Sequence, residues 1–466
     1  MAWYFGNALT GNYWYLVWLA PTPLLGLAYY RSPRTSFWLA FAACLLGRLS
    51  WLTYLQTVVS IIPALLLTLA LAYVFARIIV WSTTITHHLD SWYTVFTYPV
   101  LMTSFEYLVG TFSPDGTATS IAYTQADMVP LIQIASVTGS LGITFLVSFF
   151  PALIALGCWA YQRNRHWISY LVSSAFLVYG LSFLYSWYRI SGQKPLSGFK
   201  VGLVALEESR HHKAQQATAG QLKRLLDDYS QAISSAVAQG ATVVVLPETA
   251  IRLSLDTYQP VIASLKRTAH RYEVDLVDGL ADFSQPQARN SALVINGKGE
   301  IVADYTKNHL VRGFEGHFTA GDQVGLFKLA GQKAGVAICK DLDFPGTMRR
   351  YGNEPITSLF VPANDFVVDA WLHSRMALVR GVENGFSLVR TPRQGRLLVS
   401  DGLGHVLYEA NTSAGNKAVL IGSIPASPIS SFYTKTGNWF GLVNLLLAAY
   451  WLWRTRVVRK SILALS

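Results

Sequence analysis

The sequence predicts a polytopic α-helical membrane domain combined with an α/β domain. Residues 1–190 hold long apolar runs with only four acidic and seven basic side chains, far below the roughly one quarter of charged residues usual in soluble domains. Residues 191–432 alternate between short apolar runs typical of strands and amphipathic runs typical of helices. We therefore divide the chain into a transmembrane domain of about six helices (1–190), an α/β domain (191–432), and a final transmembrane helix with a basic tail (433–466).

A membrane-spanning helix needs about 20 predominantly apolar residues. Runs of that kind predict spans at 13–30, 36–58, 60–81, 92–110, 131–160, 167–188 and 436–454. The first run contains Pro21 and Pro23, which makes it the weakest helix. The run 131–160 is long and glycine-rich, so a tilted helix, a broken helix and a partly re-entrant start all remain open.

Arginine and lysine in short loops mark the cytoplasmic side of a membrane protein. Basic clusters follow the first, fifth and seventh runs, at 31–34, 163–165 and 454–460. Six spans before residue 190 place all three clusters on one side, which we take as the cytoplasm. The α/β domain is then expected to face the periplasm or cell exterior, on a multi-pass protein of a bacterial inner membrane.

The α/β domain is expected to contain strands in apolar runs and helices between them. The strand-like runs are 199–206, 241–248, 274–282, 291–297, 300–304, 333–339, 356–364, 386–391 and 417–424, and the helical runs are about 214–238, 256–272 and 370–383. The segments GKGE (297–300) and DGLGH (401–405) have the glycine chemistry of hairpin turns. About 240 residues suffice for one layered core.

Charge and cysteine content exclude several classes of function. The net charge of +11 does not indicate a nucleic-acid partner, because the basic residues are dispersed and several flank the apolar spans. Cys44 and Cys158 lie inside apolar runs, so no disulfide framework is indicated. No spacing of cysteine and histidine suits zinc, and we expect neither a metal nor an organic cofactor.

Three chemically active residues end strand-like runs of the α/β domain. Glu248 ends ATVVVLPE, Lys307 lies in DYTKNHL and Cys339 ends KAGVAIC. Each has an ordinary structural interpretation taken alone: a helix-start carboxylate, a solvated loop lysine and a small buried hydrophobe. A carboxylate, an ammonium and a thiol brought together can carry out acyl transfer through a thioester.

The order Glu, Lys, Cys, each at a strand end, resembles the nitrilase (carbon-nitrogen hydrolase) superfamily. The resemblance implies an α-β-β-α sandwich, with Glu248 as general base, Lys307 as oxyanion stabiliser and Cys339 as nucleophile. A backbone amide near Lys340 is a second candidate oxyanion donor. Glu315 occupies the position of the superfamily's second glutamate, although a surface loop acid is the alternative interpretation.

The flanking segments are similar to those of apolipoprotein N-acyltransferases. They are QIASVTGSLGITFLVSFF (133–150), the stretch VPANDF to RTPRQG (361–395) and FYTKTGNW (432–439). The resemblance implies a membrane N-acyltransferase that moves a fatty acyl chain from a phospholipid, through a thioester on the cysteine, to the amino-terminal amine of an apolipoprotein.

The sequence departs from that family around the candidate nucleophile. Lys340 and Asp341 stand where the family has an aromatic residue and a glutamate, and only 32 positions separate Lys307 from Cys339, so an apolar arm is shortened. A different amine acceptor, a membrane-anchored amidase and a non-catalytic membrane scaffold therefore remain alternatives. Arg48 and Glu106 lie inside spans, where an ionisable residue usually faces protein or water. They are candidates for contact with a lipid headgroup; the alternatives are snorkelling toward the interface and a structural pair.

Overall fold

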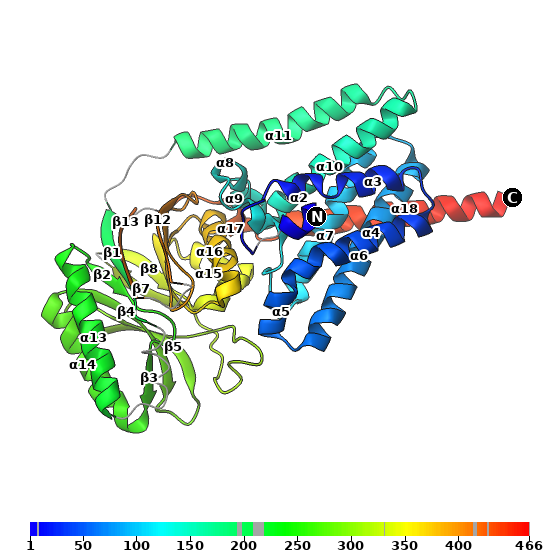
Figure 1. The fold of residues 1–466 in the computed structure, drawn as a ribbon. Coiled ribbons are helices and arrows are strands. Elements are labelled where there is room, and N and C mark those ends of the chain that lie inside the picture. The colour runs from blue at the N-terminus through cyan, green and yellow to red at the C-terminus, as the bar shows by residue number, and fades with distance from the viewer. Residues whose placement is uncertain are drawn as a thin grey trace. The chain divides into compact units, whose positions relative to one another are not determined.

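The computed structural model describes residues 1–6, 9–192, 198–207, 219–329, 331–412, 417–425 and 428–465, with side chains except at 219 and 457–465. The chain divides into two compact units, a helical unit of residues 1–192 and 436–466 and an α/β unit of residues 193–435. Figure 1 shows the helices of the first unit and the sheets of the second.

The helical unit is built from long apolar helices joined by short ones. Its helices are α1 (Ala2–Phe5), α2 (Leu16–Leu19), α3 (Thr22–Ala28), α4 (Pro33–Arg48), α5 (Leu52–Val58), α6 (Ile61–Leu89), α7 (Thr97–Phe112), α8 (Val129–Ile132), α9 (Ala135–Thr138), α10 (Ser140–Gln162), α11 (Ile168–Ser191) and α18 (Trp439–Leu465), with 3₁₀ turns at Leu49–Trp51, Trp92–Phe96 and Ile121–Gln125. Within the described residues, four stretches are long and apolar enough to cross a membrane: Pro33–Val58, Ile61–Leu89, Ser140–Gln162 and Ile168–Ser191.

Three predicted spans differ from the helices observed. The expectation of one helix over 13–30 is wrong, because α2 and α3 are separate helices that meet around Pro21, which cannot donate a backbone hydrogen bond. The run 92–110 begins as a 3₁₀ turn and becomes α-helical only at Thr97. The run 131–160 is broken at Gly139, whose φ of 68° separates α9 from α10.

Basic residues gather at one end of the helical unit. Arg165 forms an ion pair with Asp90 at 2.6 Å, which ties the end of α10 to the end of α6. Tyr30, next to the first basic cluster, donates to Gln162 at 2.5 Å. At the opposite end, Trp439 at the start of α18 donates to the carbonyl of Val137. Arg189 near the end of α11 donates to Gln133. Helix α11 therefore ends, and α18 begins, at the end of the helical unit that lacks the basic clusters.

The α/β unit is an α-β-β-α sandwich, as predicted. Its strands are β1 (Gly198–Ala205), β2 (Val243–Val245), β3 (Ile251–Ser254), β4 (Asp275–Phe283), β5 (Arg289–Ile295), β6 (Ile301–Thr306), β7 (Gly325–Leu329), β8 (Gln332–Val336), β9 (Ser358–Ala363), β10 (Ser387–Pro392), β11 (Arg396–Ser400), β12 (Val406–Asn411) and β13 (Ala418–Pro425). Its helices are α13 (Ala219–Ala238), α14 (Leu255–Tyr272), α15 (Pro345–Asn353), α16 (Ala370–Asn384) and α17 (Phe432–Thr436). The start predicted for the first helix, at about 214, lies outside the described residues.

Alternating side chains along the strands build the two sides of the core. In the described part of the chain, one sheet has the order β13-β1-β2-β4-β5-β6 with β3 beside β4, and the other has the order β12-β11-β10-β9-β8-β7. Val201 and Leu203 of β1 point between the sheets, whereas Val204 packs under α13 and α14, as expected for a period of two. Helices α15 and α16 cover the other sheet (Figure 1).

The two hairpin turns lie where they were predicted. Residues 297–300 join antiparallel β5 and β6, and residues 401–405 join antiparallel β11 and β12. Strands β3, β7, β11 and β12 and helices α15 and α17 were not predicted. These elements are only four to nine residues long, too short to establish a clear hydrophobic period.

Candidate active site

The three candidate residues follow strands that end at the same edge of the sandwich. Glu248 lies three residues beyond β2, Lys307 directly follows β6 and Cys339 lies three residues beyond β8. The Glu248 segment is bound to the opposite sheet, because its backbone N–H donates to the carbonyl of Ala363 at the end of β9 (3.2 Å). Gly279 of β4 permits this approach, since a Cβ there would lie 2.0 Å from the Pro247 carbonyl oxygen.

Lys307 lies between two carboxylates. Its Nζ donates to Glu248 Oε1 at 2.7 Å and to Glu315 Oε2 at 2.8 Å, and all three side chains are largely buried. Burial disfavours the ammonium, but the charges of Glu248, Cys339 and Glu315 overcome this effect and raise the pKa of Lys307. Lys307 is therefore a fixed cation at neutral pH.

Asn290 and Val311 complete this cluster. Asn290 Nδ2 donates to Glu248 Oε1 at 2.7 Å and to Glu315 Oε1 at 2.5 Å. The Val311 backbone N–H donates to Glu315 Oε2 at 2.7 Å. The carboxylate of Glu315 is thus oriented from the loop after Lys307, which places it in the site rather than on the surface.

Cys339 starts a 3₁₀ helix (Cys339–Asp343) in a left-handed backbone conformation, with φ of 42°. A non-glycine residue in that region stores strain and is frequent at functional sites. The thiol lies 3.6 Å from the Asn364 carbonyl oxygen. Burial and the negative charge of Glu248 raise the pKa of the Cys339 thiol well above its ordinary value, and Lys307 acts in the opposite direction.

Asp341 connects the cysteine turn to the lysine loop. One carboxylate oxygen accepts from Tyr305 Oη (2.8 Å) and the Ile338 N–H (2.9 Å), and the other accepts from the Asn308 and His309 N–H groups (3.1 and 2.9 Å). Burial raises the pKa of Asp341 to about 6, against the effect of these donors, so it is ionised at neutral pH. Its oxygens are engaged in holding backbone.

Buried ion pairs support the segment behind Cys339. Arg390 of β10 forms a two-pronged pair with Asp365, which follows Asn364. Gly395, with φ of 141°, is required beside this pair because a Cβ there would lie 2.2 Å from Asp365 Oδ2. At the start of α16, His373 Nε2 lies 3.0 Å from Asp369 Oδ2.

A cavity of about 480 Å³ opens over the cluster. Glu248, Lys307, Glu315 and Cys339 all line it. Its other walls carry aromatic and cationic side chains, namely Phe283, Phe314, Phe318, Phe366, His317, Arg252 and Arg393. Phe314 and Phe366 contact each other with ring centroids 5.3 Å apart, which joins the lysine loop to the segment after β9. Such a volume with a few convergent polar groups is typical of a small-molecule site.

The structure therefore brings Glu248, Lys307, Glu315 and Cys339 together. Lys340 and Asp341 are buried next to the cysteine but are not among the residues that line the described cavity. Arg48 and Glu106 lie in the helical unit and line a separate cavity there.

Sequence reasoning missed Asn290 and the Asp365–Arg390 pair. An asparagine at the start of a strand and an arginine inside FSLVRT are polar residues in buried positions. That contrast was the available signal, because buried polar groups require partners.

Comparison with known proteins identifies both units. Residues 203–421 match the carbon-nitrogen hydrolase family, and residues 4–153 match the apolipoprotein N-acyltransferase N-terminal domain. The apolipoprotein N-acyltransferase of Geobacter metallireducens is 24% identical over 466 residues, which covers 91% of this chain and 88% of that protein. The Bradyrhizobium diazoefficiens apolipoprotein N-acyltransferase is also 24% identical, over 73% of this chain and 70% of its own length.

Amidases are also similar to part of this chain. The 2-oxoglutaramate amidase of Bacillus subtilis is 27% identical over 34% of this chain and 70% of its own length. A crystal structure of an amidase from Nesterenkonia sp. is 20% identical, with a TM-score of 0.44 over 50% of this chain and 94% of the amidase.

An α-β-β-α sandwich with a Glu–Lys–Cys cluster, carried on apolar helices, defines a membrane-embedded carbon-nitrogen hydrolase-type enzyme. The amino-terminal domain narrows this class further. The chain belongs to the apolipoprotein N-acyltransferase family.

Proposed function

We propose that this protein transfers a fatty acyl chain from a phospholipid to the amino-terminal amine of an apolipoprotein, through a thioester on Cys339. One observation carries the proposal: Cys339 and the Glu248–Lys307–Glu315 cluster line a single cavity of about 480 Å³. Its aromatic lining suits an acyl chain. Arg252 and Arg393 in its walls suit the phosphate of a lipid donor.

The first half-reaction forms the thioester. Glu248 removes the proton from the Cys339 thiol, and the sulfur attacks the ester carbonyl carbon of the phospholipid. Lys307, held at 2.7 Å from Glu248, stabilises the oxyanion of the tetrahedral intermediate. One well-placed donor of this kind contributes about 3 kcal/mol. The C–O bond then breaks, the lysophospholipid oxygen takes the proton from Glu248, and the acyl group stays on sulfur.

The second half-reaction transfers the acyl group to nitrogen. A neutral amine attacks the thioester carbon, Glu248 takes a proton from that nitrogen, and the Cys339 sulfur leaves and regains the proton. Glu315 and Asn290 keep Lys307 and Glu248 in place through both steps, because each binds a partner in the cluster. The products are an amide and the free enzyme.

We also propose that the α/β unit faces the periplasm or cell exterior. Support comes from the basic residues at the opposite end of the helical unit, where positive charge marks the cytoplasmic side. This orientation places the catalytic unit where a lipoprotein amine is exposed after export.

Intact mass analysis tests the thioester mechanism. Purified protein mixed with phospholipid should gain the mass of one acyl chain and release lysophospholipid, and Cys339→Ala should do neither. Addition of a diacylated lipopeptide with a free amino terminus should discharge the adduct as an N-acyl peptide. Wild-type protein that never gains an acyl group and releases no lysophospholipid would sink the lipid-donor mechanism.

An amidase is the second candidate, because about a third of the chain (34%) matches a 2-oxoglutaramate amidase. Water would then resolve the thioester instead of an amine. In the same assay, hydrolysis is favoured over transfer by two results together. The acyl-enzyme is discharged at the same rate with and without the lipopeptide, and the product is a free fatty acid.

A further inference from the structure

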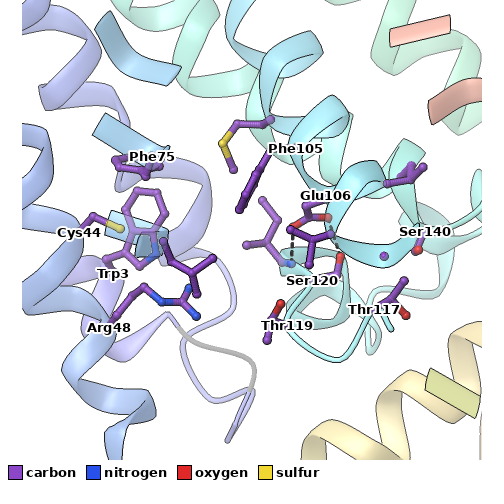
Figure 2. A pocket seen from close by; sticks show the side chains of 16 residues that line it. Trp3, Cys44, Arg48, Phe75, Phe105, Glu106, Thr117, Thr119, Ser120 and Ser140 are labelled. Carbon is purple, nitrogen blue, oxygen red and sulfur yellow. Dashed lines mark hydrogen bonds between the residues drawn. The ribbon is translucent and has the colours of Figure 1, made fainter. Parts of the chain in front are cut away.

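A second cavity lies in the helical unit, at the end opposite the basic clusters. Its volume is about 60 Å³, several times the space one water molecule needs. Figure 2 shows it between Arg48, which ends α4, and Glu106 on α7, with Ser120 and Ser140 on the far wall. None of its lining residues belongs to the cavity at Cys339.

Arg48 supplies an unsatisfied cation to this cavity. Its Nε and Nη2 are inaccessible to solvent and have no hydrogen-bond partner in the described part of the chain. The guanidinium lies over the Trp51 ring, 5.6 Å from the centroid. It also lines an adjoining space of about 30 Å³ beside Thr119 and Ser120. A buried cation without an anionic partner is costly and indicates that a ligand supplies one.

Glu106 is not that partner. Its Oε2 accepts from Ser120 Oγ (2.7 Å) and Thr144 Oγ1, and its Oε1 accepts from the Ile121 N–H (2.8 Å). These bonds hold the carboxylate against its own wall (Figure 2). Among the described residues Arg48 forms no ion pair with Glu106 or any other acid. The structural pair allowed by the sequence is therefore not formed.

Apart from a few hydroxyl side chains, the remaining walls are apolar. They include Trp3, Phe75, Met102, Phe105 and Leu141. A guanidinium fork above apolar walls suits a molecule with a phosphate group attached to hydrocarbon. A guanidinium binds phosphate, as it binds carboxylate, with two parallel hydrogen bonds, and phosphate is the anion that membrane phospholipids carry. Free phosphate would leave the apolar walls without a partner.

We propose that this cavity binds the phosphodiester of a membrane phospholipid, with Arg48 on the phosphate and the acyl chains leaving between the apolar helices. Leu65, Leu66 and Leu69 are exposed on the surface of α6, the helix that also contributes Leu71 and Phe75 to the cavity wall. This site is separate from the acyl-transfer site, because the two cavities share no lining residue. Lipid binding here requires neither Cys339 nor catalysis.

Lipid binding to full-length protein tests this site. All variants carry Cys339→Ala, so that no acyl group is transferred and the result does not depend on the transfer mechanism. Dihexanoyl phosphatidylethanolamine is titrated in detergent, and bound lipid is counted by native mass spectrometry. Lipid held in the cavity of the α/β unit contributes equally to every variant.

Arg48→Gln should weaken binding of one lipid at least tenfold, the size expected for loss of charge-assisted hydrogen bonds. Arg77→Gln is the matched control. Arg77 also lies in an apolar helix, 5.0 Å from the centroid of the Trp81 ring, but it does not line this cavity. The affinity of the Arg77→Gln protein for the phospholipid should therefore stay within twofold of that of the protein with Arg77. Dihexanoyl glycerol, which lacks phosphate, should bind wild type and Arg48→Gln alike.

Equal phospholipid affinity in wild type and Arg48→Gln overturns the proposal. Competition by millimolar inorganic phosphate overturns its lipid source in favour of a free-anion site. If Arg48→Gln does not fold, Arg48→Lys decides, because lysine keeps the charge and loses the fork. It should bind the phospholipid at least threefold more weakly, and an unchanged affinity contradicts the proposal.

Discussion

Glu248 has two opposing effects on the cysteine. Its charge helps to raise the pKa of the Cys339 thiol, which keeps the nucleophile protonated in the free enzyme. The same carboxylate can accept a proton, and it is the proposed base that removes the thiol proton. Lys307 and Asn290 donate to that carboxylate and hold it at a fixed place, and Glu315 in turn binds both of these donors. A resting thiol of this kind resists chance alkylation and oxidation, since the thiolate is the reactive form.

Glu248→Gln should separate these two effects. Loss of the charge lowers the thiol pKa and leaves Lys307 free to stabilise the thiolate, so iodoacetamide should alkylate Cys339 faster at pH 8 than in wild type. Acyl transfer should fall by about 10²–10⁴, the usual contribution of a general base. Both rates are measured in a Cys158→Ala background, because Cys158 is exposed. Slower alkylation together with slower transfer would contradict this account of Glu248.

Asp341 is expected to act through backbone geometry rather than through chemistry. Asp341→Asn replaces two acceptor oxygens by one oxygen and an NH₂ that meets backbone N–H donors, at a cost of about 2–4 kcal/mol. The melting midpoint of the α/β unit should fall by about 5–10 °C. Tyr305→Phe removes one of the four hydrogen bonds and should cost about 1 kcal/mol. An Asn variant that melts as wild type and is nevertheless inactive would show a chemical role.

The candidate site residues at strand ends could be predicted individually from the sequence. The residues that hold them in place could not. Glu248, Lys307 and Cys339 follow apolar runs whose ends the sequence marks. Asn290 reaches both glutamates only because β5 pairs with β4 and β6 in one sheet, and that register depends on contacts distant in sequence. Asp365 and Arg390 meet through parallel pairing of β9 and β10 for the same reason.

Among the secondary-structure elements, α16 joins the segment after β9 to the turn that carries Cys339. His373 in its first turn lies 3.0 Å from Asp369 and 3.9 Å from Asp343, which ends the cysteine turn. Asp369 precedes the helix, where a carboxylate is favoured by the helix dipole. Burial disfavours the imidazolium of His373, but the Asp369 charge overcomes this and raises its pKa to about 9.

This pair predicts a pH-dependent stability of the α/β unit. Because the folded-state pKa of His373 lies above its unfolded value of about 6.5, the stabilisation is fully present below pH 6.5 and is lost as pH rises through about 9. The difference of about 2.5 between these two pKa values corresponds to a loss on the order of 3 kcal/mol. The melting midpoint should fall between pH 6.5 and 9.5 in wild type and less steeply in His373→Gln. The same slope in both proteins would assign the effect to another group.

At the scale of the whole molecule, composition predicted the two kinds of unit but not every helix boundary. Apolar content and length mark long helices such as α6, α10 and α11. The prediction of a single helix over 13–30 was wrong because it rested on average apolar content, which does not take account of Pro21. The predicted orientation in the membrane depends instead on arginines in the loops. A shift of a helix boundary by a few residues does not change it, provided that the number of membrane crossings between the loops stays the same.

Cysteine labelling of intact spheroplasts tests that orientation. Two single-cysteine proteins are made in a Cys44→Ala, Cys158→Ala, Cys339→Ala background: Lys298→Cys, in an exposed hairpin turn of the α/β unit, and His166→Cys, in the exposed basic loop after α10. Because positive loops stay in the cytoplasm, a membrane-impermeant maleimide should label the first in intact cells and the second only after permeabilisation. The reverse pattern would place the Glu248–Lys307–Cys339 site in the cytoplasm, where a lipoprotein amine exposed after export could not reach it. The labelling therefore decides whether the proposed acceptor can meet the acyl-enzyme.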